Sequence, residues 1–318
     1  MTQDQVTYLV FGILLVLALA FDLGLLSKKH AHITIKKALW QTIFWVSLAI
    51  GFFVFLWFRN GQVMALEYVS AYLMEWSLSI DNIFVFILIF TFFKVKEDYY
   101  ARVLLIGIMM AIIFRVIFIT VGIVVVERFE WILYVFGAFL VYTGIQMFTA
   151  KSKEVVELEK NKVYRILKKI LPLTPEDNNG RLTLRKDGKK YYTSIFVVIV
   201  MLATTDLVFA LDSIPAVFAI SQERLVIYTS NIFAVLGLRS LFFLLRGAVN
   251  KFGHLQQGIA VVLVFIGLKM LVEIFKIHVP VYISLLVILL SITASIIYSI
   301  SVADKDKQGD TDTESISK

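Results

Sequence analysis

The chain contains nine runs of apolar residues that are each long enough to cross a lipid bilayer as a helix. A transmembrane helix needs about 20 mostly apolar residues, because its rise of about 1.5 Å per residue must span a hydrocarbon core of about 30 Å. Only 17% of the 318 residues are charged, whereas a soluble domain carries roughly 25%. The sequence therefore predicts an all-α, polytopic membrane protein with spans at residues 6–27, 38–58, 65–93, 103–126, 131–150, 193–220, 225–247, 255–276 and 279–302.

Lysines and arginines are concentrated in every second loop. Of the 31, 24 fall in loops on one side of the predicted bundle and four in loops on the other side. Because cytoplasmic loops carry the excess of basic residues, this places the N-terminus outside and the C-terminus in the cytoplasm. The net charge of +7 then reflects membrane topology, so we expect the lipid bilayer, and not nucleic acid, as a partner. No basic residue precedes the first run, which we interpret as a retained span and not as a signal peptide.

The chain has no cysteine. Disulfides, iron–sulfur clusters, thiolate metal sites and dithiol redox centres are therefore excluded. The four histidines fall at predicted helix ends or in loops, so no facing pair is available inside the membrane to bind a haem. We expect no catalytic residues and no tightly bound cofactor.

Three features of the third to fifth runs return, in the same order, in the sixth to eighth. The first is a motif that consists of an acid, five intervening residues, an Asp, a small polar residue and an Ile. The second is an intramembrane Arg, and the third is a Val-x-x-Gly-x-x-Met motif. The matched positions are Glu75, Asp81 and Asn82 with Asp206, Asp212 and Ser213; Arg115 with Arg239; and Val141, Gly144 and Met147 with Val264, Gly267 and Met270. The sequence thus predicts an internal repeat.

The repeat divides the chain into units. Residues 65–150 form the first three-helix copy and residues 193–276 the second. Because three is odd, the second copy crosses the membrane in the opposite sense, which is the inverted repeat of many secondary transporters. Residues 1–64, with the first two spans, and residues 277–302, with the ninth, are peripheral additions.

Residues 151–192 form the one sizeable loop, on the cytoplasmic side. Apolar residues at positions 163, 166, 167, 170 and 171 follow one face of a helix, and the surrounding lysines favour a location on an anionic membrane surface. Two short strands around Asp187-Gly188 predict a β-hairpin. The loop is interpreted either as a linker between the repeats or as a docking or gating element. Residues 303–318 are polar and predicted to be disordered.

Four acids inside the predicted membrane suggest a cation site. A carboxylate at the bilayer centre costs at least about 2.5–3.5 kcal/mol, so it requires a partner or a function. The oxygen-only ligand set suits Mg²⁺, Ca²⁺ or Mn²⁺ alike, and four carboxylates with two arginines leave a charge that one divalent cation would neutralise. Protons could replace the metal on such grouped acids. The candidate ligands are Glu75, Asp81, Asn82, Asp206, Asp212 and Ser213, with Arg115 and Arg239 as supporting charges. The competing interpretation is a structural ion pair between these acids and the arginines.

The spacing within each motif makes a geometric prediction. Antiparallel alignment of the third and sixth spans is expected to set Glu75 level with Asp212 and Asp81 level with Asp206, about 9 Å apart along the helices. Positions six apart differ by about 240° around a regular helix, so both acids of one motif reach a single ion only if the helix unwinds. Pro215 favours such a break in the sixth span.

Three strings, at residues 77–86, 209–220 and 229–239, closely resemble the TerC/Alx family of bacterial membrane proteins, and the similarity extends over about residues 10–300. The resemblance implies a multi-pass protein of the bacterial inner membrane, related to the LysE-type exporters, with Mn²⁺ efflux as its activity. The family's metal-site acids correspond to Glu75, Asp81, Asp206 and Asp212. Some members supply metal to secreted proteins, which implies the secretion machinery as a partner. Redox modulation and tellurite resistance are also names attached to the family. This chain has no cysteine and so offers no thiol chemistry for either.

Two other functions compete with transport. A metal sensor, or a protein that helps to metalate exported proteins, would use the same ligands. An intramembrane aspartyl protease would let two Asp residues share a proton, but the expected Gly-x-Gly-Asp context is missing at Asp81 and Asp212.

Overall fold

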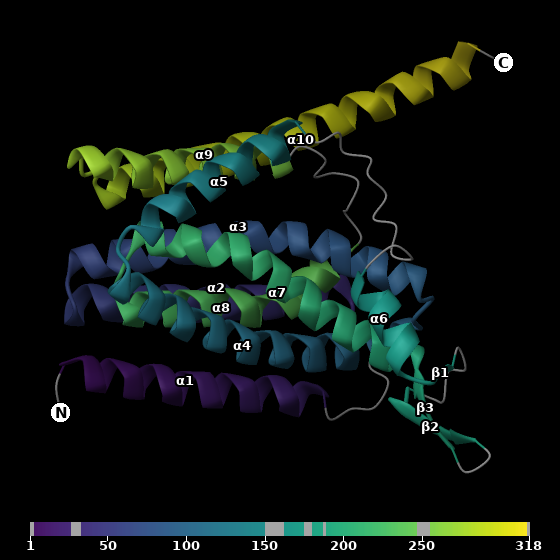
Figure 1. Cartoon of the computed structure of the whole chain (residues 1–318). Coiled ribbons are helices and arrows are strands. Elements are labelled where there is room, and N and C mark those ends of the chain that lie inside the picture. Colours follow the sequence, from purple (N-terminus) through teal and green to yellow (C-terminus); the bar gives the residue numbers. More distant parts are fainter. Residues whose placement is uncertain are drawn as a thin grey trace.

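The computed structural model describes residues 3–26, 33–149, 162–174, 180–186, 189–246 and 255–316. Nine long helices run side by side through it (Figure 1), and each coincides with one of the nine apolar runs, so the all-α prediction is confirmed for the membrane part. The helices are α1 (Gln3–Leu26), α2 (Ile35–Arg59), α3 (Gln62–Phe92), α4 (Glu97–Arg128), α5 (Ile132–Thr149), α7 (Ser194–Ile220), α8 (Arg224–Leu245), α9 (Leu255–Val272) and α10 (Val281–Ile316).

Seven candidate membrane spans meet the requirements of length and composition within the described residues. The remaining two apolar helices, Gln5–Ala20 in α1 and Ile132–Phe148 in α5, are shorter. The chain is therefore a polytopic membrane protein.

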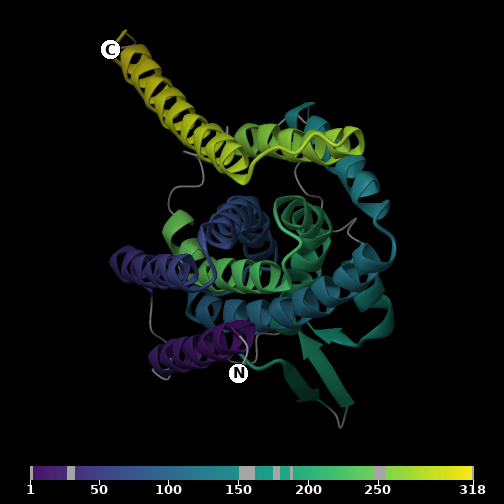
Figure 2. The ribbon, with the colours of Figure 1, turned by 90° about the vertical axis from the view of Figure 1, so that its left-hand side faces the viewer.

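Helix α8 lies inside the bundle, where it packs against α2, α3 and α4. In its most apolar stretch, 94% of the residues are buried, whereas the other spans leave many large apolar side chains exposed. Figure 2 shows α8 surrounded by its neighbours, with α1 at one edge and α10 at the other. In a membrane protein the outer apolar side chains contact lipid, so only a central helix can be buried on all sides.

Besides the contact of α3 with α8, two further contacts organise the bundle: α4 packs against α7, and α5 packs against α9. The last pair approaches closely through glycine. A Cβ on Gly267 would lie 2.6 Å from the carbonyl oxygen of Gly137, and one on Gly144 would lie 2.8 Å from that of Ala260. Small residues that let two backbones approach are typical of membrane helix pairs.

The prediction that the sixth span unwinds is wrong. Both α3 and α7 are continuous helices, and α7 includes Pro215 in its interior. Proline removes one backbone hydrogen bond, but in a membrane helix the neighbouring chains make such a loss tolerable. Asp206 and Asp212, the two acids of the α7 motif, therefore face in different directions.

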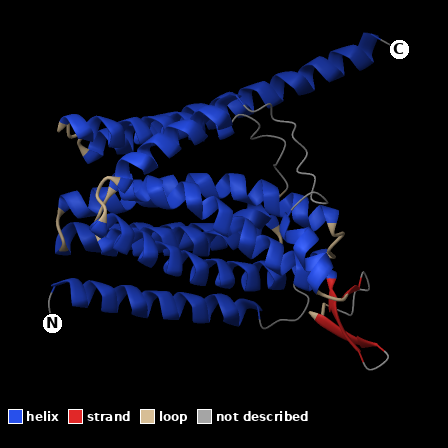
Figure 3. Cartoon of the chain, viewed as in Figure 1, coloured by secondary structure: helices blue, strands red, loops and turns tan. Residues whose placement is uncertain are grey.

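The predicted helix and hairpin in the 151–192 loop are both present (Figure 3). Helix α6 (Lys162–Ile170) is followed by β1 (Leu173–Thr174), β2 (Thr183–Lys186) and β3 (Lys189–Thr193). Strands β2 and β3 pair antiparallel with Lys186 opposite Lys189, while the turn residues 187–188 lie outside the described residues. Strand β1 pairs in parallel with β3; it was not predicted, because two residues have no periodicity.

Helix α10 continues to Ile316, into the segment 303–318 for which the sequence predicts disorder. Figure 1 shows this end of α10 extending beyond the other helices. An existing helix extends without the cost of nucleation, and Ala303, Lys305 and Lys307 favour extension.

Candidate functional site

A buried arginine joins two of the predicted acids. Arg115 on α4 is 2% exposed and donates from Nε to Oδ2 of Asp206 at 3.1 Å and from Nη2 to Oδ1 at 3.0 Å. Its Nη1 forms an ion pair with Oε1 of Glu75 on α3. Glu75 and Asp206 are 0% and 1% exposed. Helices far apart in sequence thus bring three charges together in the interior of the bundle.

Asn231 completes this cluster and was not among the predicted site residues. Its Oδ1 accepts a second hydrogen bond from Nη1 of Arg115 at 3.1 Å, and its Nδ2 donates to the carbonyl oxygen of Ile227 at 3.0 Å. The second bond fixes the orientation of the amide, so that the oxygen faces the guanidinium. A buried amide in an apolar helix is the sequence signal that could have identified it.

The cluster is not fully satisfied. Oε2 of Glu75 is buried and has no hydrogen-bond partner among the described residues. With both acids ionised, two carboxylates and one guanidinium carry a net charge of −1. A buried carboxylate oxygen without a partner is unfavourable, so the cluster can bind a further cation or a proton at this oxygen.

The predicted alignment of the acids is wrong. Arg115 contacts Glu75 and Asp206 with one planar group, so these two acids share a level, instead of Glu75 facing Asp212. Glu75 and Asp206 are the matched first acids of the two motifs. The spacing within a motif does not determine the level at which two helices cross, so aligning the motif centres placed the two helices at the wrong level.

The second acid of the α7 motif faces elsewhere. Asp212 is half-buried, and its Oδ1 accepts from Oγ1 of Thr143 on α5 at 3.4 Å. Asp206 instead faces Arg115 on α4, which follows from the angle of about 240° between positions six apart. Ser213, next to Asp212, is buried with no hydrogen-bond partner for its Oγ within the described ranges.

The other predicted residues are placed only in part. Asn82 on α3 is 2% exposed, and Arg239 on α8 is 3% exposed. Asp81 belongs to α3, but its side chain lies outside what the structure describes. Among the described residues, no group of three or more His, Asp or Glu side chains is arranged to hold a metal ion. The structure thus brings together Glu75, Asp206 and Arg115, as in the competing ion-pair interpretation.

The opposite ends of the bundle differ in the charge of their cavities. At the end where α4 stops and α8 begins, a cavity of about 510 Å³ is lined by Glu127, Glu130 and Glu273. At the other end, a cavity of about 550 Å³ is lined by Lys94, Lys96 and Lys168. The cavity lined by lysines lies at the end of the bundle that carries the loops rich in Lys and Arg, and the cavity lined by glutamates lies at the opposite end.

A bundle of long apolar helices with charged residues in its interior defines a polytopic integral membrane protein in which the buried charges form the candidate site. Sequence comparison then gives the family. Residues 60–308 match the integral membrane protein TerC family, and the chain belongs to that family.

The relatives are similar over nearly their whole length. An uncharacterized membrane protein of Myxococcus xanthus is 40% identical over 282 residues, covering 89% of this chain and 88% of the relative. The Alx protein of Salmonella typhi, whose name proposes a membrane-bound redox modulator, is 39% identical over 296 residues, covering 90% and 91%. An uncharacterized membrane protein of Rickettsia felis is 37% identical over 294 residues, covering 92% and 97%. No solved structure matches.

Proposed function

We propose that this protein transports a divalent cation, Mn²⁺ before others, out of the cytoplasm across the bacterial inner membrane. The observation that carries the proposal is the buried pair of Glu75 and Asp206, joined by Arg115, with Oε2 of Glu75 unpartnered. The proposal includes nine spans, an outside N-terminus and a cytoplasmic C-terminus. The loop charges and the acidic and basic cavities at opposite ends support that orientation.

We further propose that α3–α5 and α7–α9 are inverted copies that move against each other in alternating access. The repeat relates α3 to α7, α4 to α8 and α5 to α9, and the packing follows this correspondence. The contact of α3 with α8 corresponds to that of α7 with α4, and α5 packs against its counterpart α9. The matched motifs pack in the same reciprocal way. A Cβ on Gly144 would lie 2.7 Å from Cγ2 of Val264, and one on Gly267 would lie 2.8 Å from Cγ2 of Val141. Val141 is the counterpart of Val264, and Gly144 that of Gly267.

In this proposal Arg115 is the internal counter-ion of the metal-free site. Its guanidinium occupies the position between Glu75 and Asp206, where a divalent cation would neutralise the same two carboxylates. The cation would displace the guanidinium and gain oxygen ligands of the kind that Mn²⁺ accepts. Asp81, Asn82, Asp212 and Ser213 follow one to two turns further along α3 and α7. They would contribute oxygens in another conformation of the transport cycle, because Asp212 faces Thr143 in this one.

The choice of Mn²⁺ rests on the resemblance to manganese-exporting members of the family. A redox function, which the name of Alx proposes, would require a redox group, and a chain without cysteine has no dithiol to supply it. A proton-sharing aspartyl pair fits Asp206 poorly, because both of its carboxylate oxygens accept hydrogen bonds from Arg115 and neither faces a second aspartate among the described side chains.

Flux measurements in proteoliposomes test the proposal. Glu75→Gln and Asp206→Asn each remove one ligand charge and are expected to abolish Mn²⁺ flux, as are Asp81→Asn and Asp212→Asn. Glu127→Gln is the matched control, because Glu127 is 50% exposed and pairs with Arg224 on the surface. Wild-type flux in all four site variants would rule out transport through this site.

A further inference from the structure

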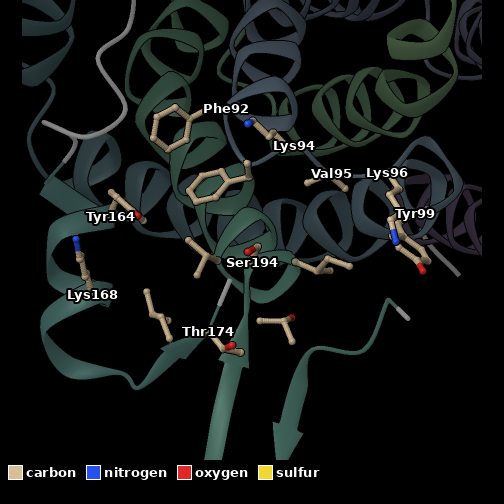
Figure 4. A pocket seen from close by; sticks show the side chains of 14 residues that line it. Phe92, Lys94, Val95, Lys96, Tyr99, Tyr164, Lys168, Thr174 and Ser194 are labelled. Atoms are coloured by element: carbon tan, nitrogen blue, oxygen red, sulfur yellow. The ribbon is translucent and has the colours of Figure 1, made fainter. Parts of the chain in front are cut away.

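A cavity of about 550 Å³ lies between the end of α3, the start of α4, helix α6 and the start of α7. Figure 4 shows aromatic and lysine side chains around this cavity. No described residue that lines it is acidic. Within the described ranges, Lys94 and Lys168 form no ion pair. Among the described residues, the lining of the cavity is therefore positively charged and includes no acidic side chain.

The cavity has an apolar wall as well as a basic rim. Phe92, Phe93, Tyr164 and Ile195 contribute that wall, and the rings of Phe92 and Phe93 lie 6.2 and 5.4 Å from that of Tyr164. A free phosphate or another small hydrophilic anion would gain nothing from these aromatic side chains. A ligand with an anionic head and a hydrocarbon chain would contact both.

Helix α6 shows where the membrane surface lies relative to this cavity. Ile166 and Ile170, one helical turn apart, are 55% and 70% exposed, and Lys168 lies between them in sequence. Exposed isoleucines beside lysines are typical of a helix lying in the headgroup region. The rim is further polarised by the first turn of α7, where Ser194 and Ile195 line the cavity and the N-cap residue Thr193 forms no side-chain cap. The helix dipole there favours negative charge.

From these contacts we propose that the cavity is a binding site for an anionic glycerophospholipid of the cytoplasmic leaflet. The phosphate group lies against Lys94, Lys168 and the start of α7, and an acyl chain lies along the aromatic wall. Basic pockets on the cytoplasmic side of membrane helices bind acidic lipids by the same chemistry. The proposal does not depend on which ion the protein transports.

Lipid titration of the purified full-length protein, followed by native mass spectrometry, tests the site. Phosphatidylglycerol is expected to bind more tightly than phosphatidylcholine. The double substitution Lys94→Gln with Lys168→Gln is expected to weaken phosphatidylglycerol binding by roughly tenfold or more, because each lysine near an anionic headgroup contributes about 1 kcal/mol. Phosphatidylcholine binding should not change, and Lys94→Arg with Lys168→Arg should keep the preference for phosphatidylglycerol.

Lys36→Gln with Lys37→Gln is the matched control, since it removes two charges at the start of α2, outside the cavity. It is expected to leave phosphatidylglycerol affinity unchanged. Equal affinity in the Lys94 and Lys168 double variant and in the wild type would overturn the proposal. Displacement of phosphatidylglycerol by millimolar inorganic phosphate would identify a free anion as the ligand and overturn the assignment to lipid.

Discussion

Arg115 and Asp206 form a two-point contact, with Nε to Oδ2 at 3.1 Å and Nη2 to Oδ1 at 3.0 Å, between two residues that are almost fully buried. Paired parallel hydrogen bonds of this kind are the strongest form of arginine–carboxylate contact. The third guanidinium nitrogen is used by Glu75 and Asn231. One side chain of α4 therefore connects α3, α7 and α8.

Removing this cation is expected to destabilise the protein strongly. Arg115→Met leaves Glu75 and Asp206 buried without a counter-ion, and breaking a buried pair in this way costs about 3–5 kcal/mol. Thermal unfolding in detergent measures the effect. Arg224→Met, which breaks an exposed pair with Glu127, should cost no more than about 1 kcal/mol.

A divalent cation should stabilise the Arg115→Met variant more than the wild type, because it neutralises the two buried, unpaired carboxylates without displacing a guanidinium. The measured quantity is the shift in unfolding temperature on adding Mn²⁺. An equal shift in both proteins would contradict the role of Arg115 as the internal counter-ion.

Asn231 is expected to affect transport by holding the guanidinium of Arg115 in place. Asn231→Leu removes the acceptor for Nη1 of Arg115 and the bond to Ile227, so the guanidinium loses one of its constraints. We expect Mn²⁺ flux to fall about tenfold, the effect of losing roughly one hydrogen bond to a charged group. Ser230→Ala is the control, since the neighbouring Ser230 is equally buried but bonds only to the carbonyl oxygen of Ile227. A similar loss in both variants would indicate a general packing defect.

The contact between α5 and α9 predicts sensitivity to a single methyl group. Gly267→Ala places a Cβ 2.6 Å from the carbonyl oxygen of Gly137, so the helices must separate, at a cost of about 1–3 kcal/mol. Thermal unfolding checks this. Gly51→Ala, where no atom lies within 4 Å of the new Cβ, should leave the unfolding temperature unchanged or slightly raised.

Proton coupling is a separate expectation. Metal binding requires deprotonated carboxylates, so Mn²⁺ affinity should fall as the pH falls, because protons compete with the metal for the same oxygens. In proteoliposomes, a proton gradient that drives protons in the direction opposite to the Mn²⁺ flux should accelerate Mn²⁺ transport. Flux that ignores an imposed gradient would exclude this coupling while leaving metal transport itself intact.

Much of the fold follows from the sequence alone. Each long helix is an apolar run, because backbone groups in hydrocarbon must form their hydrogen bonds within the segment. The hairpin follows from local signals, namely Asp187-Gly188 between two short strands. The helical end of α10 was missed because polar composition predicts disorder, although a helix can propagate from a membrane span into a polar segment.

The sequence by itself pointed to Glu75, Arg115 and Asp206, since charges are rare inside a membrane and the two matched motifs and the intramembrane arginine contain these residues. Only the tertiary structure decided how they meet. It placed Glu75 and Asp206 on one guanidinium, directed Asp212 toward Thr143, and added Asn231 from α8. Sequence spacing fixes the angle of a side chain around its own helix. The level at which two helices cross depends instead on the packing of all their neighbours, including the glycine contacts of α5 with α9.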